Sequence, residues 1–187
     1  MLKVAGFSLL EALISIVLSS LIVIGCSSFY LQLQTNIIQY SQTIQLRNNV
    51  NQALVGLTKD IRRAGFIAND PAKMTAKALD INAQQNCVII RYDSEIRNDW
   101  IYNPANKKAS DIFAYRYHKN NLEYKVAALD CQDPNWEKLF DPAKYKVTHF
   151  VIKPINNGIE ISLAAELIKN KHINYQVIKI VKNENLF

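Results

Sequence analysis

The sequence has few of the residues on which catalytic sites and phosphate-binding loops depend. Its 187 residues include three histidines and five glycines. His118, His149 and His172 form neither an H-x-x-x-H nor an H-E-x-x-H motif, so the usual spacing of a helical zinc site is absent. G-x-S-x-G and P-loop motifs are also absent. We therefore expect no catalytic residue, metal, cofactor or small-molecule substrate, and we expect each histidine to lie on the surface of a strand.

Charge is scarce in the first part of the chain. Between Phe7 and Ile24 the single charged residue is Glu11. Because Lys3 and Glu11 cancel, the net charge of +6 belongs to the remainder of the 21.3 kDa chain. A basic balance permits weak attraction to nucleic acid or to an anionic lipid surface and specifies neither. The length fits one domain, or one domain with an appendage.

The apolar stretch from Phe7 to Gly25 is rich in Leu, Ile and Val. As an α-helix it would be about 28 Å long, which is close to the hydrocarbon thickness of a bilayer. It is longer than the apolar region of a cleaved secretory signal, and no A-x-A-like site follows it. The stretch therefore predicts a retained membrane span, for which a plain signal anchor is one interpretation.

The short leader MLKVAG ends at Gly6 and is followed by FSLLE. This junction resembles the class III signal of type IV pilins and pseudopilins, in which a prepilin peptidase cuts after Gly and methylates the new N-terminal Phe. The resemblance implies cleavage between Gly6 and Phe7 and N-methylation of Phe7, with the helix retained. Lys3 lies on the flank expected in the cytoplasm, so we expect a single-pass protein of the inner membrane whose C-terminal domain is periplasmic.

Glu11 is the fifth residue after the expected cut. A carboxylate in a membrane span costs about 2.5–3.5 kcal/mol on insertion scales, so it normally has a partner. After cleavage the Phe7 amine is a nearby cation, and the family resemblance implies that Glu11 meets the amine of a neighbouring subunit during filament assembly. The alternative is that Glu11 lies in the headgroup region and titrates there.

Apolar residues continue at helical spacing beyond the span. They recur in two sets, separated by a phase shift near Gln45: Leu33, Ile37, Tyr40 and Ile44, then Leu46, Val50, Ala53, Leu57, Ile61 and Ala64. No proline occurs between Leu33 and Ala64, and Gly65 is a favourable helix stop. We therefore expect a leader at 1–6, a transmembrane helix at 7–28 and an amphipathic continuation at 29–65.

The segment KDIRRAGF, Lys59 to Phe66, resembles the helix exit of minor pilins of the PilW and PulJ kind. The matching positions are Arg62, Gly65 and Phe66. The segments NCVIIRYDSEIRNDW and DCQDPNW also resemble sequences of this group, so the likeness covers nearly the whole chain.

After residue 65 the pattern changes to period two with β-branched residues, which predicts strands in a periplasmic domain at 66–187. The expected strands are 87–92, 111–118, 121–127, 146–152, 158–167 and 172–182. Turn residues at 119–121 and 156–158 indicate hairpins. One long helix on one antiparallel sheet gives a fold of the α+β class, as in type IV pilins.

The three cysteines divide into one pair and one spare. Cys87 and Cys131 lie in the polar part of the chain, and in an exported domain we expect them to form a disulfide. Cys26 is expected to be a free apolar residue. Asp93, Glu95, Asn98 and Asp99 suggest a calcium loop, but the glycine and the closing glutamate that such a loop needs are absent, and a solvated loop is the better interpretation.

These features predict a minor pilin that initiates or tips a type IV pilus. Its partners would be the prepilin peptidase, other minor pilins, the major pilin and the inner membrane. Two alternatives stay open: a J-type pseudopilin of type II secretion, and a DNA-uptake component that binds DNA through its basic domain, which is the less favoured.

Overall fold

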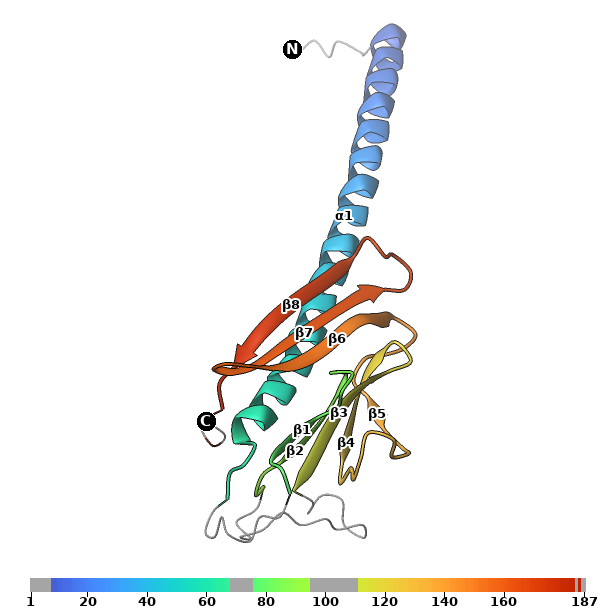
Figure 1. Cartoon of the computed structure of the whole chain (residues 1–187). Coiled ribbons are helices and arrows are strands. Elements are labelled where there is room, and N and C mark those ends of the chain that lie inside the picture. The colour runs from blue at the N-terminus through green and yellow to red at the C-terminus, as the bar shows by residue number, and fades with distance from the viewer. Residues whose placement is uncertain (1–7, 68–75, 95–110, 184, 186–187) are drawn as a thin grey trace. The chain divides into compact units, whose positions relative to one another are not determined.

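The structure is a computed structural model that describes residues 8–67, 76–94, 111–183 and 185. The chain divides into two compact units, Met1–Gln42 and Thr43–Phe187. One helix belongs to both units, and all strands belong to the second (Figure 1). The elements are α1 (Leu9–Arg63), β1 (Leu79–Ile81), β2 (Cys87–Arg91), β3 (Ile112–His118), β4 (Asn121–Val126), β5 (Glu137–Lys138), β6 (Tyr145–Ile155), β7 (Gly158–Leu167) and β8 (Asn174–Val181).

α1 changes character along its length. Up to Gln42, none of its described residues is buried. From Leu46 onward one face is buried, as the second apolar set predicts, and it includes Leu46, Val50, Leu54, Leu57, Ile61 and the following Ala64. The first set remains exposed, with Ile37 at 59% and Tyr40 at 70%. The phase shift near Gln45 therefore coincides with the point where the helix enters the core of the second unit.

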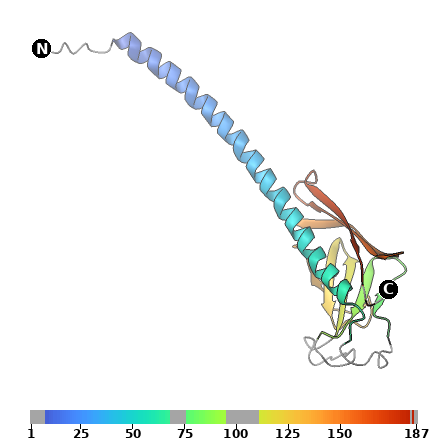
Figure 2. The same ribbon diagram turned by 90° about the vertical axis from the view of Figure 1, so that its left-hand side faces the viewer.

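The strands form two antiparallel sheets, which corrects the expectation of one. The first has the order β1-β2-β3-β4-β5 and the second the order β6-β7-β8. Both sheets contribute to a single core with the C-terminal part of α1 (Figures 1 and 2). Alternation along a strand predicts which face is buried but not which strand is its neighbour, so the division into two sheets could not be derived from period two.

Several strand limits differ from those expected. β1 and β5 are additional, because strands of three and two residues are too short to give a periodic signal. β6 extends to Ile155 and contains an irregularity between Val147 and His149. β8 begins at Asn174, so His172 lies in the preceding turn and not in a strand.

The two expected hairpin turns are present. Lys119 and Asn120 have φ of 47° and 58° between β3 and β4, the pattern of a type I′ turn. At the second turn Ile155 pairs with Gly158, whose φ is 152°. A Cβ at Gly158 would collide with the carbonyl oxygen of Val181, so glycine allows β7 to begin close to the end of β8.

Candidate membrane helix and assembly site

The N-terminal half of α1 presents apolar side chains on all sides. Leu9 is 81% exposed, and the best 18-residue window of the helix has a mean hydropathy of 2.4 with none of it buried. Isolated apolar side chains on a surface are ordinary, but a continuous apolar helix requires a lipid or protein environment. By length and composition α1 can cross a membrane, and among the described residues it is the one helix that can.

The polar side chains of this segment are satisfied within the helix. The hydroxyls of Ser15, Ser19 and Ser20 donate to the carbonyl oxygens of Glu11, Ser15 and Val17 at 2.8, 2.6 and 2.7 Å. Ser27 and Ser28 donate in the same way to the preceding turn. Hydrocarbon offers no hydrogen-bond partners, so this arrangement lets five serines enter a bilayer without an unsatisfied hydroxyl.

Glu11 lies in the first turn of α1 and faces back toward the start of the helix. Its Oε2 accepts a hydrogen bond from the backbone N–H of Ser8 at 3.3 Å, and the Ser8 carbonyl accepts the first helical bond, from Ala12, at 3.1 Å. This is one half of a capping box, and S-x-x-E at Ser8–Glu11 is its sequence signal. A negative charge there also interacts favourably with the helix dipole. Gly6 and Phe7 lie outside the described residues.

A buried carboxylate on the core face of α1 fixes the C-terminal end of the helix to the β domain. Asp60 accepts hydrogen bonds from the hydroxyls of Tyr92 at 2.9 Å and Tyr115 at 2.7 Å. Burial raises the pKa of Asp60, while the two tyrosine hydrogen bonds and the nearby Lys59 and Arg63 act in the opposite direction. Burial beside Asp60 also raises the pKa of both tyrosines, so their hydroxyls remain donors. The network therefore ties α1 to β3 and to the end of β2.

The sequence reasoning missed Asp60, although a signal was present. Asp60 follows Leu57 by three residues and precedes Ala64 by four, so it interrupts the apolar face of the helix. A carboxylate at a core position requires buried donors. The sequence therefore indicates that buried donors exist, but not which residues they are. Two tyrosines, 32 and 55 residues further along the chain, supply them.

We expect Asp60→Asn to change how stability depends on pH. Because the folded-state pKa of Asp60 is raised above 3.8, its protonated form is favoured in the folded state. The contribution of this group to the free energy of unfolding is therefore fully present below pH 3.8 and declines as pH rises through the folded pKa. The asparagine side chain of the variant cannot titrate, so the stability difference, wild type minus variant, should decrease with rising pH in that window.

Urea unfolding of the full chain at a series of pH values, followed by near-ultraviolet circular dichroism, measures this difference. Asp80→Asn is the control, because Asp80 lies on an exposed position of β1. A difference that increases with pH for Asp60→Asn would contradict the assignment.

Backbone contacts around the KDIRRAGF segment end the helix and fix its C-terminal end to the β domain. Gly65 has a φ of 80°, and its N–H donates to the carbonyl oxygen of Arg91 at 2.9 Å. The Asn183 side chain, which follows β8, donates to the carbonyl oxygens of Ile61 and Ala64. The helix stop expected at Gly65 is thus confirmed, and Asn183 supplies the cap from the far end of the chain.

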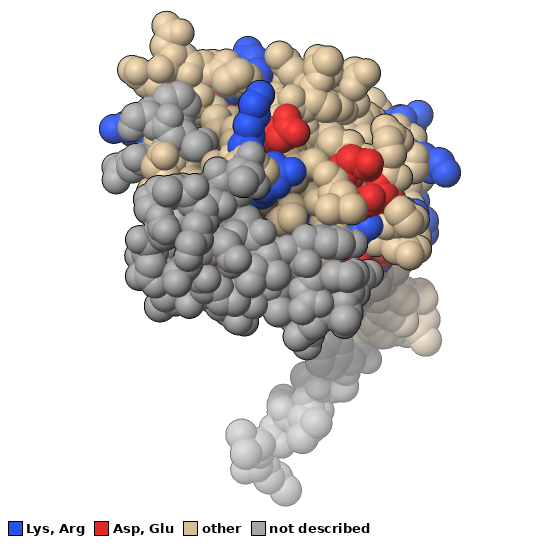
Figure 3. Space-filling model, turned by 60° about the horizontal axis from the view of Figure 1, so that its bottom comes forward, with Lys and Arg blue, Asp and Glu red and all other residues tan. Residues whose placement is uncertain are grey.

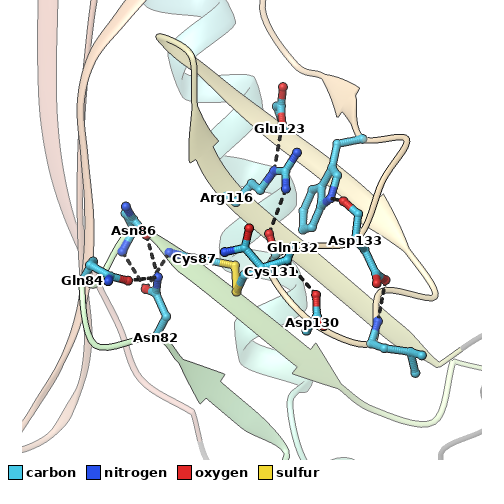
Figure 4. The surroundings of a disulfide bond; sticks show 12 residues. Asn82, Gln84, Asn86, Cys87, Arg116, Glu123, Asp130, Cys131, Gln132 and Asp133 are labelled. Carbon is cyan, nitrogen blue, oxygen red and sulfur yellow. Dashed lines mark hydrogen bonds and ion pairs between the residues drawn. A yellow bond between two sulfur atoms is a disulfide. The ribbon is translucent and has the colours of Figure 1, made fainter.

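A disulfide links the start of β2 to the loop after β4. The sulfur atoms of Cys87 and Cys131 are bonded (Figure 4). Cys26 is free and exposed. Arg116 holds the same loop: its Nη1 donates to the Cys131 carbonyl oxygen at 2.8 Å, and its Nε donates to Glu123 at 2.9 Å (Figure 4). The guanidinium also lies 4.3 Å from the centre of the Trp136 ring.

The disulfide loop covers the face of the five-stranded sheet that is turned away from α1. On that face Cys131 and Trp136 pack on a small cluster made by Ile89, Ile112, Ala114 and Ala128. β2 is therefore buried on both faces, which explains its uninterrupted apolar run.

The structure does not bring the other candidate ligands together. Within the described residues no group of three or more His, Cys, Asp or Glu side chains could hold a metal ion. Asp93 is buried, and its N–H donates to the Phe66 carbonyl oxygen at 2.9 Å, whereas Glu95, Asn98 and Asp99 lie outside the described residues. His118 ends β3 with Nδ1 3.4 Å from Glu123, and His149 is exposed on β6.

Basic and acidic side chains are mixed on one face of the described part of the chain. In Figure 3 Lys and Arg are scattered among acidic and uncharged residues on the face shown. Lys153 pairs with Glu160 at 2.8 Å and Lys125 with Asp133 at 3.2 Å. These pairs neutralise part of the positive charge, and the DNA-binding alternative stays a prediction.

The comparisons with known proteins agree with this architecture. A family model described as prepilin peptidase-dependent protein B matches residues 39–183. The chain is 29% identical over 140 residues to prepilin peptidase-dependent protein B of Escherichia coli (strain K12), covering 75% of this chain and 72% of that protein. Its fold is similar to a type IV-like pilin from Thermus thermophilus, with a TM-score of 0.50 and 9% identity over 75% of this chain and 97% of the other. The family match begins after the apolar segment, so the Gly6–Phe7 junction lies outside it.

Proposed function

Because the chain belongs to the family of prepilin peptidase-dependent protein B, we propose that it is a minor pilin that joins other minor pilins to initiate or tip a type IV pilus. The observation that carries the proposal is α1 itself. One face of its C-terminal part is buried in a β domain, while its N-terminal part is apolar, exposed and long enough to span a bilayer. Such a helix can lie in a membrane before assembly and pack on other helices afterwards.

In this proposal the protein is a substrate of the prepilin peptidase and performs no catalysis. The peptidase cuts between Gly6 and Phe7 and methylates Phe7, which leaves an amine four residues before Glu11. The 3.3 Å bond from Ser8 to Glu11 is long for an N–H···O bond. Exchanging it for a charge-assisted bond to the amine of a neighbouring subunit would therefore strengthen the contact. Glu11 is the assembly residue on this reasoning.

Two features support the proposed orientation, Lys3 and the disulfide. A short basic leader is expected to stay in the cytoplasm, and the β domain would then lie in the periplasm. A disulfide persists in that oxidising compartment and not in the cytosol, so the Cys87–Cys131 bond supports the same orientation.

A deletion strain tests the proposed role. We expect loss of surface pili and of twitching with normal type II secretion, and restoration of pili by the full chain supplied in trans. Co-purification of the processed protein with other minor pilins and the major pilin would identify the partners. Loss of secretion with normal pili would contradict the proposal and favour the J-type pseudopilin.

A further inference from the structure

β8 is a long open edge of the three-stranded sheet. Along one side it pairs with β7, and no described strand pairs with its other side (Figure 1). The edge strands of the first sheet, β1 and β5, have three and two residues, whereas β8 has eight. Unpaired N–H and C=O groups along a strand of that length are a template for another strand.

The opposite edge of the same sheet, β6, is protected. Its Val147 and Ile152 amides donate to the carbonyl oxygens of Asn120 and Gln85 at 2.9 and 2.8 Å. β6 also contains Pro154 and an irregularity at Val147/His149, and both features discourage strand addition. β8 has no proline and no register shift within its pairing with β7.

The register identifies the free backbone groups of β8. The Leu167 amide donates to the Ile173 carbonyl oxygen at 3.0 Å, and hydrogen-bonded pairs alternate with non-bonded pairs along an antiparallel ladder. Tyr175, Val177 and Lys179 therefore bond to β7. The residues that alternate with them, Gln176, Ile178 and Ile180, direct their N–H and C=O groups toward the open side.

The same residues expose apolar side chains. Ile178 is 58% and Ile180 64% exposed, on the face of the sheet opposite the core. They lie beside Ser162 and Glu160 of β7, and Glu160 is already paired with Lys153. An added strand would thus gain a backbone ladder and an apolar contact together.

The positive charge around β8 favours an acidic partner strand. Between Ile168 and Lys182 the sequence has four lysines, Lys169, Lys171, Lys179 and Lys182, and no acidic residue. A second copy of β8 would place lysines against lysines, whereas a strand carrying carboxylates would be attracted.

We propose that the open edge of β8 binds an extended, acidic segment of another protein, which adds to the sheet as a fourth strand. This surface lies beyond the proposed role in pilus initiation, because the folded chain would present it whether or not it is processed. Gln176, Ile178 and Ile180 supply the ladder, the two isoleucines supply the apolar contact, and Lys179 and Lys182 supply the charge.

Two labelled eight-residue peptides test the proposal against the full chain in detergent micelles. One alternates valine with glutamate and the other alternates valine with lysine. By fluorescence anisotropy at low salt, we expect the glutamate peptide to bind at least tenfold more tightly. Amide exchange followed by NMR should show the amides of Gln176, Ile178 and Ile180 exposed in the free chain and protected with the glutamate peptide, while Val177 and Lys179 are protected in both.

Variants separate the backbone and charge contributions. Ile178→Pro removes an outward N–H without breaking the bonds to β7, so it should weaken glutamate-peptide binding at least tenfold, whereas Ile178→Thr keeps the N–H and should weaken it much less. The double variant Lys179→Glu/Lys182→Glu should reverse the preference between the peptides. If Ile178→Pro loses its near-ultraviolet circular dichroism, the double variant decides.

Three results would overturn the proposal. They are equal affinity for the two peptides, unchanged binding by a folded Ile178→Pro variant, and concentration-dependent protection of the Ile178 amide without peptide, which would show a second copy on the edge. None depends on cleavage at Gly6, so the minor-pilin role and this surface can fail separately.

Discussion

Gly6→Val is expected to abolish processing of the chain. The resemblance to class III signals places the cut directly after Gly6, and a β-branched side chain there would obstruct access to the scissile bond. The uncut chain would keep Lys3 and would lack a free amine at Phe7, so Glu11 would lose its proposed partner in the filament. Intact mass of the membrane-extracted protein, from cells with an active prepilin peptidase, measures the effect, and only the full-length mass is expected.

The matched control is Ala5→Val, which makes a similar change one residue before the cleavage residue. It should leave most of the chain cut, with a mature mass beginning at N-methyl-Phe7. If the wild-type chain itself retains Met1 in the same cells, or if Gly6→Val is cut as well as wild type, the proposed processing is wrong.

Removal of the disulfide is expected to reduce the stability of the β domain by a large amount. The bond joins residues 44 apart, and in the chain-entropy model a loop of this size is worth about 4 kcal/mol. Cys87→Ser with Cys131→Ser should therefore lower the free energy of unfolding by about that amount and the melting temperature by roughly 8–16 °C. The loop would also pack less firmly on Ile89 and Ala114, the small cluster that Trp136 helps to cover.

Thermal unfolding of the full chain, followed by near-ultraviolet circular dichroism, measures the shift. Cys26→Ser is the control, because Cys26 is exposed and lies outside the β domain. The melting temperature of this variant should match that of the wild type. Equal melting temperatures for all three proteins would show that Arg116 and Trp136 hold the loop without the covalent bond.

One helix meets two sets of requirements in this protein. Its N-terminal half must be free of unsatisfied polar groups in hydrocarbon, and the serine hydroxyls achieve this by donating to their own helix. Its C-terminal half must be fixed to a β domain, which Asp60 and the Asn183 cap achieve. The buried face that begins at Leu46 packs in the one core to which both sheets contribute.

Features that depend on local spacing could be predicted from the amino-acid sequence. The apolar run to Gly25, the buried helix face from Leu46 to Ala64 and the stop at Gly65 are each recognisable because helical periodicity and glycine chemistry act over a few residues. The α+β class followed from the change of period after the helix. The junction at Gly6 and Phe7 and the role of Glu11 stay predictions.

Apart from the Cys87–Cys131 pair, which distant residues meet became clear only in the folded chain. The partners of Asp60, the cap from Asn183 and the division into two sheets join segments far apart in the chain, and period two is the same whichever strands are neighbours. The free edge of β8 is the clearest case. Its sequence contains isoleucines and lysines at alternating positions, but whether its backbone is paired depends on where the sheet ends, and only the strand order β6-β7-β8 shows that it ends there.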